Sequence, residues 1–265
     1  MILSLQQQFQ ACIELNSAYQ FVANYKELTL SSVFQPIFNR QDGIIGVEAL
    51  VRIKTAQGMQ IRPDAYFQSN AINLEDKINV ERLSRAIHIR NFSRSKYAHL
   101  KLFLNVLPSA TEYLTYNGLD NSLLIKRLND LNIQHSQLVM ELVELKFHDD
   151  DTLRETMMKL SDQGFHVAVD DYGTKASTKE RVELIQPAIV KLDRSIMLDF
   201  LDAKPEKLYE GLRVAKSIGA KVVVEGIETK HQYDTMKQLD IDMFQGYYLA
   251  MPEALSPYES ITCLN

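Results

Sequence analysis

The chain has 265 residues, of which 46% are hydrophobic and 24% charged, and its formal net charge is −5. This composition is typical of a soluble globular protein that can bury a full core. The negative balance argues against non-specific binding of nucleic-acid polymers through the whole surface.

The small number of cysteines and the lack of a targeting segment narrow the class of protein further. The only cysteines are Cys12 and Cys263, which lie near opposite ends and show neither metal-binding nor disulfide spacing. This usage favours a reducing, cytoplasmic location. There is no basic leader segment and no apolar run of about 18 residues, so we predict neither a signal peptide nor a membrane span.

The first elements predicted along the chain are a helix and a hairpin. Residues 1–29 place Leu5, Phe9 and Ile13 roughly on one face of a helix, so we expect an N-terminal helical extension. Two apolar runs, SVFQPIFNR and GIIGVEALVRI, then flank Gln41-Asp42-Gly43. Asp-Gly between two such runs is a hairpin signal, so the first two strands are predicted to be antiparallel.

Strand-like and helix-like segments alternate along the remainder of the chain. Helices are expected at the C-terminal end and over residues 63–71, 76–95, 108–130, 151–164, 204–218 and 229–239. Strands are expected at KLFLNVL, QLVMELVE, HVAVDD, AIVKLD, KVVVE and DMFQG. Eight strands with intervening helices predict an α/β fold, a TIM-like (β/α)8 barrel with an antiparallel first strand. A doubly wound open sheet is the alternative. No linker divides the chain, so we predict a single barrel domain over residues 30–265 after the extension.

Carboxylate and amide side chains recur where the apolar runs end, at Glu48, Asn105, Glu141, Asp170, Asp171, Glu225 and Gln245. The carboxyl ends of barrel strands converge on one face, where active sites form. Oxygen ligands without cysteine or clustered histidine suit Mg²⁺, Mn²⁺ or Ca²⁺. The consecutive pair Asp170-Asp171 could bridge two ions, an arrangement suited to phosphoester hydrolysis. Lys191 could orient the attacking water or offset phosphate charge.

Simpler interpretations exist for each feature. A single carboxylate at a strand end is more often a helix cap or a surface charge, and Lys191 with Asp193 could form an ordinary surface pair. One predicted helix carries four arginines, which we interpret as a solvated face rather than a nucleic-acid patch: Arg82, Arg85, Arg90 and Arg94.

Taken in order, the motifs resemble the EAL domain, the bacterial cyclic di-GMP phosphodiesterase family, over roughly residues 30–255. The matching text is Gln35-Pro36-Ile37, Glu48-Ala49-Leu50-Val51-Arg52, Asn105 with Pro108, Glu141-Leu142-Val143-Glu144, Asp170-Asp171-Tyr172-Gly173-Thr174, Lys191-Leu192-Asp193-Arg194, Glu225-Gly226-Ile227-Glu228-Thr229 and Gln245-Gly246-Tyr247.

The resemblance implies a barrel that hydrolyses cyclic di-GMP to linear pGpG with two Mg²⁺ or Mn²⁺ ions, and a homodimer as the family expectation. The implied metal ligands are Glu48, Asn105, Glu141, Asp170, Asp171 and Glu225. The implied catalytic positions are Lys191, Glu225, Glu228, Gln245 and Glu144, of which Glu144 steadies the loop after the aspartate pair. The implied substrate contacts are Gln35, Arg52 and Asp193.

The loop over residues 172–180 departs from the family pattern. Lys175 stands where the family has a glycine and Ala176 where it has an aromatic residue. In the family this loop connects the second metal site with the dimer interface. The departure leaves open a catalytically weak or silent EAL domain that acts as a cyclic di-GMP receptor or protein-interaction module. An unrelated metal-dependent barrel lyase or hydrolase is the third possibility.

Overall fold

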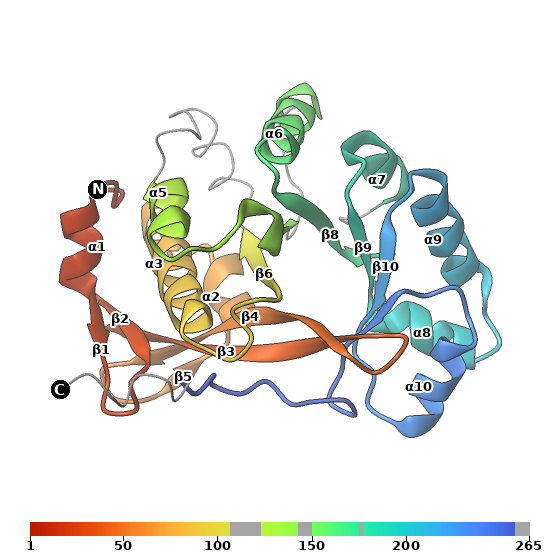
Figure 1. Ribbon diagram of the computed structural model, residues 1–265, viewed down its shortest axis with the longest axis horizontal. Coiled ribbons are helices and arrows are strands. Elements are labelled where there is room, and N and C mark those ends of the chain that lie inside the picture. The colour runs from red at the N-terminus through yellow and green to blue at the C-terminus, as the bar shows by residue number, and fades with distance from the viewer. Residues whose placement is uncertain (107–122, 143–149, 175–177, 258–265) are drawn as a thin grey trace.

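Eight strands close into a barrel in the computed structural model, which describes residues 1–106, 123–142, 150–174 and 178–257 (Figure 1). In ring order they are β3 (Leu28–Asn39), β4 (Ile44–Thr55), β6 (Lys101–Val106), β7 (Leu138–Leu142), β8 (His166–Tyr172), β9 (Ile189–Leu192), β10 (Lys221–Val224) and β11 (Met243–Phe244). β11 pairs back with β3, which closes the ring. Strand β3 is antiparallel to both of its ring neighbours, and the other neighbouring pairs are parallel. The predicted barrel with an antiparallel first strand is confirmed, and the open-sheet alternative is wrong.

The predicted hairpin joins β3 to β4 and also contacts the segment that leads into β11, where the ring closes. The backbone N–H of Asn39 donates to the carbonyl of Gly43 at 2.9 Å, and Asp42 adopts a φ of 63° in the turn. Arg40 donates to three carbonyls at and just beyond the C-terminal end of α10 (Lys230–Lys237), at 2.7–2.8 Å. Because α10 lies between β10 and β11, these bonds support closure of the barrel.

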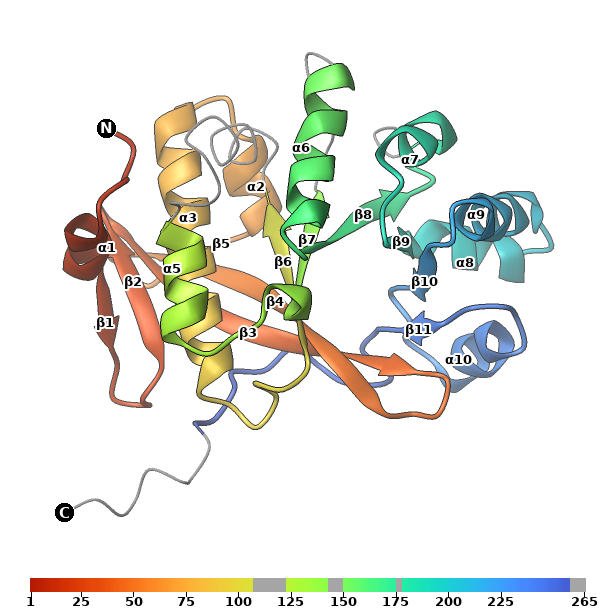
Figure 2. The ribbon, with the colours of Figure 1, turned by 45° about the horizontal axis from the view of Figure 1, so that its top comes forward.

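Helices surround the parallel strands (Figure 2). Beyond β4 come β5 (Gln60–Ile61), α2 (Pro63–Gln68) and α3 (Leu74–Ser93), followed further along the chain by α5 (Leu123–Asp130), the 3₁₀ helix His135–Gln137, α6 (Asp150–Asp162), α7 (Lys179–Ile185), α8 (Arg194–Leu201) and α9 (Glu206–Ser217). The sequence did not predict α7 and α8, which have seven and eight residues and are too short to give a clear period. Part of the helix predicted over 108–130 lies outside the described residues. No helix occurs in residues 245–257, where the terminal helix was expected to begin. A separate finding concerns membranes: among the described residues, no helix is both long and apolar enough to cross a bilayer.

The N-terminal region differs from the predicted helical extension. Only α1 (Gln6–Cys12) is helical, and β1 (Ile13–Leu15) and β2 (Phe21–Tyr25) form an antiparallel ribbon that extends the sheet beyond β3. The apolar stripe that suggested a helix covers little more than two turns. From Phe21 onward, strand pairing with β1 and β3 buries Val22 and Ala23, partly buries Phe21 and Tyr25, and overrides that local pattern. The division between extension and barrel stays a prediction.

The four arginines of the predicted helix 76–95, three in α3 and Arg94 at its C-cap, do not form the solvated face expected from the sequence. Arg82 and Arg85 are buried, and Arg82 donates to a backbone carbonyl of the N-terminal segment at 2.6 Å. Arg90 and Arg94 lie over the ring of Phe21 at 5.2 and 5.3 Å from its centroid. The prediction failed because the N-terminal ribbon and the segment before it pack on α3, which no local pattern in the helix reveals.

Inside the barrel, an apolar layer lies below a polar layer. The apolar layer consists of Ile37, Phe103, Val139, Ala168, Ile189, Val223 and Met243. The polar layer consists of Gln35, Glu48, Asn105, Glu141, Asp170, Lys191, Glu225 and Gln245. Each polar residue stands two positions from an apolar one, or from Gly46 in β4, so both point to the same side of the strand. Gly46 leaves room for the ring of Phe103, whose Cε2 would lie 2.9 Å from an added Cβ.

Candidate active site

Lys191 of β9 lies at the centre of the polar layer. Its side chain is 1% exposed, and its Nζ is surrounded by carboxylates from four other strands or strand ends. The Nζ–oxygen distances are 2.5 Å to Glu141, 2.7 Å to Glu225, 3.2 Å to Asp170 and 3.5 Å to Glu48. One ammonium therefore faces four carboxylates, so the surface-pair interpretation of Lys191 is wrong.

Amide side chains fix the position of Glu48. Asn105 Nδ2 donates to Glu48 Oε1 at 3.1 Å, and Gln245 Nε2 donates to Glu48 Oε2 at 2.8 Å. Gln245 Nε2 also lies 3.4 Å from Gln35 Oε1, and Gln35 Nε2 donates to the carbonyl of Ala250 at 3.1 Å. Both oxygens of Glu48 are thus held by neutral donors that keep the carboxylate in one orientation.

A β-bulge places two consecutive aspartates at the end of β8. Val169 pairs with Val190 and Tyr172 with Leu192, so Asp170 and Asp171 together stand opposite the single residue Lys191. A bulge redirects side chains that would otherwise alternate between the two faces of a strand. Asp171 accordingly has a φ of 51°, a left-handed conformation that is uncommon for a residue other than glycine.

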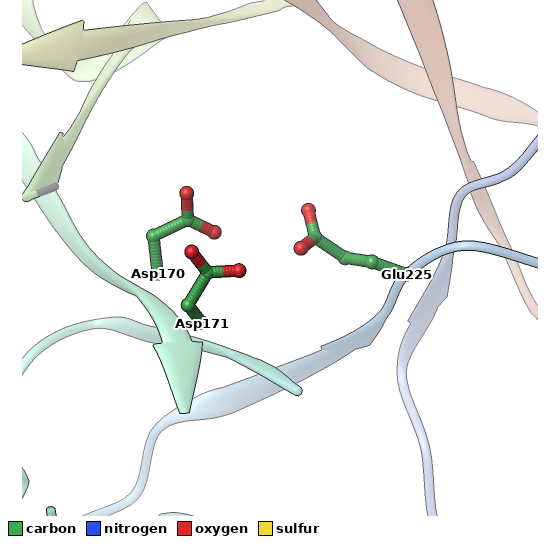
Figure 3. A group of neighbouring side chains, drawn as sticks. All are labelled: Asp170, Asp171 and Glu225. Atoms are coloured by element: carbon green, nitrogen blue, oxygen red, sulfur yellow. The ribbon is translucent and has the colours of Figure 1, made fainter. Parts of the chain in front are cut away.

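Asp170, Asp171 and Glu225 direct their carboxylates toward one another, as Figure 3 shows. One oxygen from each lies within 4.8 Å of the others. Like charges at this spacing repel, and the three residues come from two strands separated in the ring by β9. The arrangement therefore needs either protons or cations to balance its charge.

The electrostatics of the layer reflect this imbalance. Burial is the main cause that raises the pKa of Glu141 well above its ordinary value, and the charge of the neighbouring Glu48 is the second. Burial also raises the pKa of Glu225. Partial burial and the charges of Asp170 and Asp193 raise the pKa of Asp171 to about 6. Burial alone would lower the pKa of Lys191, but its surrounding carboxylates outweigh burial and hold that pKa well above its ordinary value, so the ammonium stays charged.

The residues present fit divalent cations that prefer oxygen ligands. Glu141 Oε2 and Gln245 Oε1 are buried and accept no hydrogen bond from any residue that the structure describes. Buried polar atoms are rarely left without a partner unless a ligand supplies one. The donors are carboxylate and amide oxygens, which suit Mg²⁺, Mn²⁺ or Ca²⁺.

The loops after β10 and β11 pass each other closely and fix Glu225 relative to Gln245. An added Cβ at Gly246 would lie 2.1 Å from the carbonyl oxygen of Ile227, so only glycine fits there. The N–H of Ile227 donates to the carbonyl of Gln245 at 3.1 Å. Gly246 is thus required by the contact between two site loops.

Four residues predicted for the site lie outside the polar layer or outside the described residues. Asp193 is the N-cap of α8, and its Oδ1 accepts from the N–H of Ser195 at 2.9 Å. Glu228 pairs with Arg194 rather than with the polar layer. Arg52 lies on β4 beyond Glu48, and its Nη1 donates to the carbonyl of Val51 at 3.1 Å. Glu144 lies outside the described residues.

Sequence reasoning assigned no role to Arg194, although it belongs to one of the matching motifs. Its Nη2 donates to Glu228 Oε2 at 2.5 Å, across 34 positions of sequence. The available signal was the Asp-Arg-Ser text after an apolar strand, which is typical of a helix start. That signal marks Asp193 as a candidate cap for a following helix, but it does not indicate the partner of the arginine.

Comparison with known proteins gives one family. The model of the EAL domain matches residues 21–252. The chain is 28% identical over 228 residues to the "Probable cyclic di-GMP phosphodiesterase PdeG" of Escherichia coli, covering 83% of this chain and 44% of that protein. The chain spans less than half the length of the first curated relatives that it matches.

Solved structures share the fold. The YkuI protein of Bacillus subtilis, solved with an EAL domain in complex with cyclic di-GMP and calcium, has a TM-score of 0.75 and 24% identity over 88% of this chain and 58% of that one. BlrP1 of Klebsiella pneumoniae, solved as a complex with manganese and cyclic di-GMP, has a TM-score of 0.72 and 23% identity over 84% of this chain and 56% of that one. At these identities the structures establish the barrel alone.

Proposed function

This chain belongs to the EAL domain family, and from that premise we propose that it is a metal-dependent phosphodiesterase that hydrolyses cyclic di-GMP to linear pGpG. The observation that carries the proposal is the excess of carboxylates over cations in the polar layer, where Lys191 Nζ is within 3.5 Å of four acidic side chains. The names of relatives such as PdeG support the choice of substrate.

Two Mg²⁺ or Mn²⁺ ions would be held by these residues. We assign Glu48, Asn105, Glu141 and Asp170 to one ion and Asp171 to the second, and Glu225 contributes to the same metal centre. Bound divalent cations lower the pKa of water and offset the charge that develops on phosphate oxygens. The spacing of Asp170, Asp171 and Glu225, with oxygens within 4.8 Å of one another, supports this assignment.

Lys191 acts as a hydrogen-bond donor rather than as a base. Its ammonium stays protonated because the surrounding carboxylates raise its pKa, and an ammonium has donors but no acceptor. It can therefore hold the attacking water through a lone pair and offset the negative charge of the phosphodiester. Gln245 and Asn105 keep Glu48 in place through their amide hydrogen bonds.

The substrate contacts are assigned to Gln35 and Arg52 on the two antiparallel strands. Gln35 pairs in register with Glu48, so its amide lies directly beside the metal ligands. Arg52 stands four residues beyond Glu48 on β4, and a guanidinium fork matches a pair of phosphate oxygens. Asp193 takes part indirectly, since its carboxylate caps α8.

The proposal is tested by incubating the full chain with cyclic di-GMP and Mg²⁺ or Mn²⁺ and separating the products. We expect pGpG to form with the wild type and with Lys207→Ala, a control that breaks an ion pair remote from the polar layer. Glu48→Ala should abolish the product. Tight binding of cyclic di-GMP without pGpG would instead support the receptor, and neither binding nor turnover would leave the unrelated lyase or hydrolase.

A further inference from the structure

The first turn of α8 contacts both loops that carry the clustered carboxylates. Helix α8 begins at Arg194, three residues after Lys191, and Asp193 caps it through the N–H of Ser195. The backbone N–H of Asp193 also reaches the carbonyl of Tyr172 at 3.3 Å, and that of Glu225 reaches Leu192 at 3.3 Å. The turn therefore starts between the ends of β8 and β10.

The loop after β10 rests on Arg194. Gly226 has a φ of +67°, and an added Cβ would lie 2.7 Å from both Cβ and Cδ of Arg194. The arginine stem therefore lies flat against this backbone, and its Nη2 reaches Glu228 Oε2 at 2.5 Å. On the far side of the loop, the N–H of Glu228 donates to Gln232 Oε1 in α10 at 2.7 Å. Residues 226–228, directly after Glu225, are thus held from two helices.

The loop after β8 rests on Ile196, two positions after Arg194 in the same turn. Gly173 has a φ of +95°, and an added Cβ would lie 2.4 Å from Cδ1 of Ile196. Ile196 is buried, so its side chain packs under the loop that begins with Asp171. The N–H of Thr174 returns to the carbonyl of Asp171 at 3.1 Å. One helical turn therefore supports the loops of Asp171 and Glu225 together.

We propose that Arg194 and Ile196 are positioning residues that hold Asp171 and Glu225 at the spacing a divalent cation needs, with Arg194 acting through Glu228. This inference rests on the proposed function. Three carboxylates within 4.8 Å repel one another, and the loops that carry them would separate without a common support. Glu228, placed by resemblance among the catalytic positions, serves the site through this ion pair.

Binding of Mn²⁺ alone tests the proposal, with free Mn²⁺ followed by its electron paramagnetic resonance signal. We expect Arg194→Ala and Glu228→Ala each to raise the Kd for Mn²⁺ about 10-fold or more, as loss of partners behind metal ligands does elsewhere. The double variant should be no worse than either single variant, because both remove one interaction. The exchange Arg194→Glu with Glu228→Arg should recover most of the affinity. Lys207→Ala, which breaks an ion pair between α8 and α9 (2.9 Å), is the matched control and should bind as the wild type does.

Two further readouts separate positioning from general damage. In Arg194→Ala, turnover lost at low Mn²⁺ should return when Mn²⁺ is raised, which a misfolded protein would not show. Ile196→Val removes only the methyl that lies over Gly173 and should raise the Kd a few-fold without unfolding the chain. Arg194→Lys, which keeps the charge, should fall between wild type and Arg194→Ala.

The outcomes distinguish this inference from the proposed function. Equal Mn²⁺ affinity in Arg194→Ala and Lys207→Ala, with pGpG formed by the wild type, would overturn the positioning role alone. Weakened Mn²⁺ binding in the variants, with no pGpG from the wild type, would support positioning and overturn the phosphodiesterase. A wild type that binds no Mn²⁺ would overturn both.

Discussion

Two groups of buried charges in this molecule are built in opposite ways. In the barrel, one ammonium, that of Lys191, faces four carboxylates that come from other strands. On α3, the single carboxylate of Glu81 lies 3.0 Å from Arg85 and beside Arg82, all within two turns of one helix. The first group has too little positive charge, whereas the second has more than it needs.

The difference separates a candidate site from a structural ion pair. Burying a charge is unfavourable unless it is paired, and the α3 group contains its own counter-charges next to it in sequence. The barrel group collects acidic residues from distant segments and leaves most of their charge unbalanced. Such an arrangement persists where a ligand supplies the missing positive charge, which is why we place function in the barrel and stability in α3.

The largest effect is expected from a carboxylate of the barrel group. Asp171→Ala should lower pGpG formation by about 10³-fold or more, since a lost ion removes both charge stabilisation and water activation. The metal-free variant should melt at the same temperature as the wild type or higher, because burial and neighbouring charges already raise the pKa of Asp171 and disfavour its ionised form in the fold. Steady-state kinetics and thermal melts in EDTA measure both.

Asp199→Ala is the matched control, since Asp199 pairs with Lys207 far from the polar layer. It should retain turnover. Unchanged activity in Asp171→Ala would remove Asp171 from the site.

The single cation of the barrel group gives the next effect. Lys191→Met leaves the buried carboxylates without their ammonium, so the unfolding free energy of the metal-free protein should fall by about 3–5 kcal/mol. Added Mn²⁺ should restore part of the loss, because it supplies positive charge to the same oxygens. Urea titrations with EDTA and with Mn²⁺ measure this. A variant as stable as the wild type in EDTA would show that the carboxylates do not depend on Lys191.

Substitutions in the α3 group should change the free energy of unfolding and leave turnover nearly unchanged. Glu81→Gln leaves Arg85 buried without its partner, and the unfolding free energy should fall by about 3 kcal/mol. Turnover at 25 °C should change less than about twofold, because the pair touches no residue of the polar layer. The double variant Glu81→Leu, Arg85→Leu should recover much of the stability, since an apolar pair needs no solvation. A loss of turnover as large as that of Asp171→Ala would contradict the separation of roles.

Much of the barrel group could be predicted because the direction of each side chain depends on its position along its own strand. A period of two along a strand puts Val139 and Glu141, or Ile189 and Lys191, on the same side, so polar residues at the ends of apolar runs identify the inward positions directly. The resemblance then added residue roles that periodicity cannot give. The bulge at Asp170-Asp171 was not predicted, because it depends on how β8 pairs with β9.

What could not be predicted depends on contacts between distant segments. Arg194 meets Glu228 only because Gly226 takes a positive φ and brings the loop against α8. The arginines of α3 were predicted to be exposed, because the sequence of the helix does not show that the N-terminal segment packs on it. Likewise, the residues around Phe21 were expected to be helical, and pairing with β1 and β3 makes them a strand.

The smallest effect concerns a third buried ionisable group, the imidazole of His88 in α3. Burial, aided by the charge of Arg52, lowers the pKa of His88 to about 3, and its Nδ1 lies 2.7 Å from Ser32 Oγ. The unfolded chain takes up this proton near pH 6.5, whereas the folded chain resists it. The contribution of neutral His88 to the free energy of unfolding is therefore fully present well above pH 6.5, and it falls as the pH drops toward 3. The loss due to His88 should be about 2 kcal/mol between pH 6.5 and 5. Urea titrations across this range should show a shallower pH dependence in His88→Gln than in the wild type, while His231→Gln, at an exposed position, keeps the wild-type slope. Equal slopes in all three proteins would mean that His88 is protonated in the folded state and that its burial is less complete than its contacts indicate.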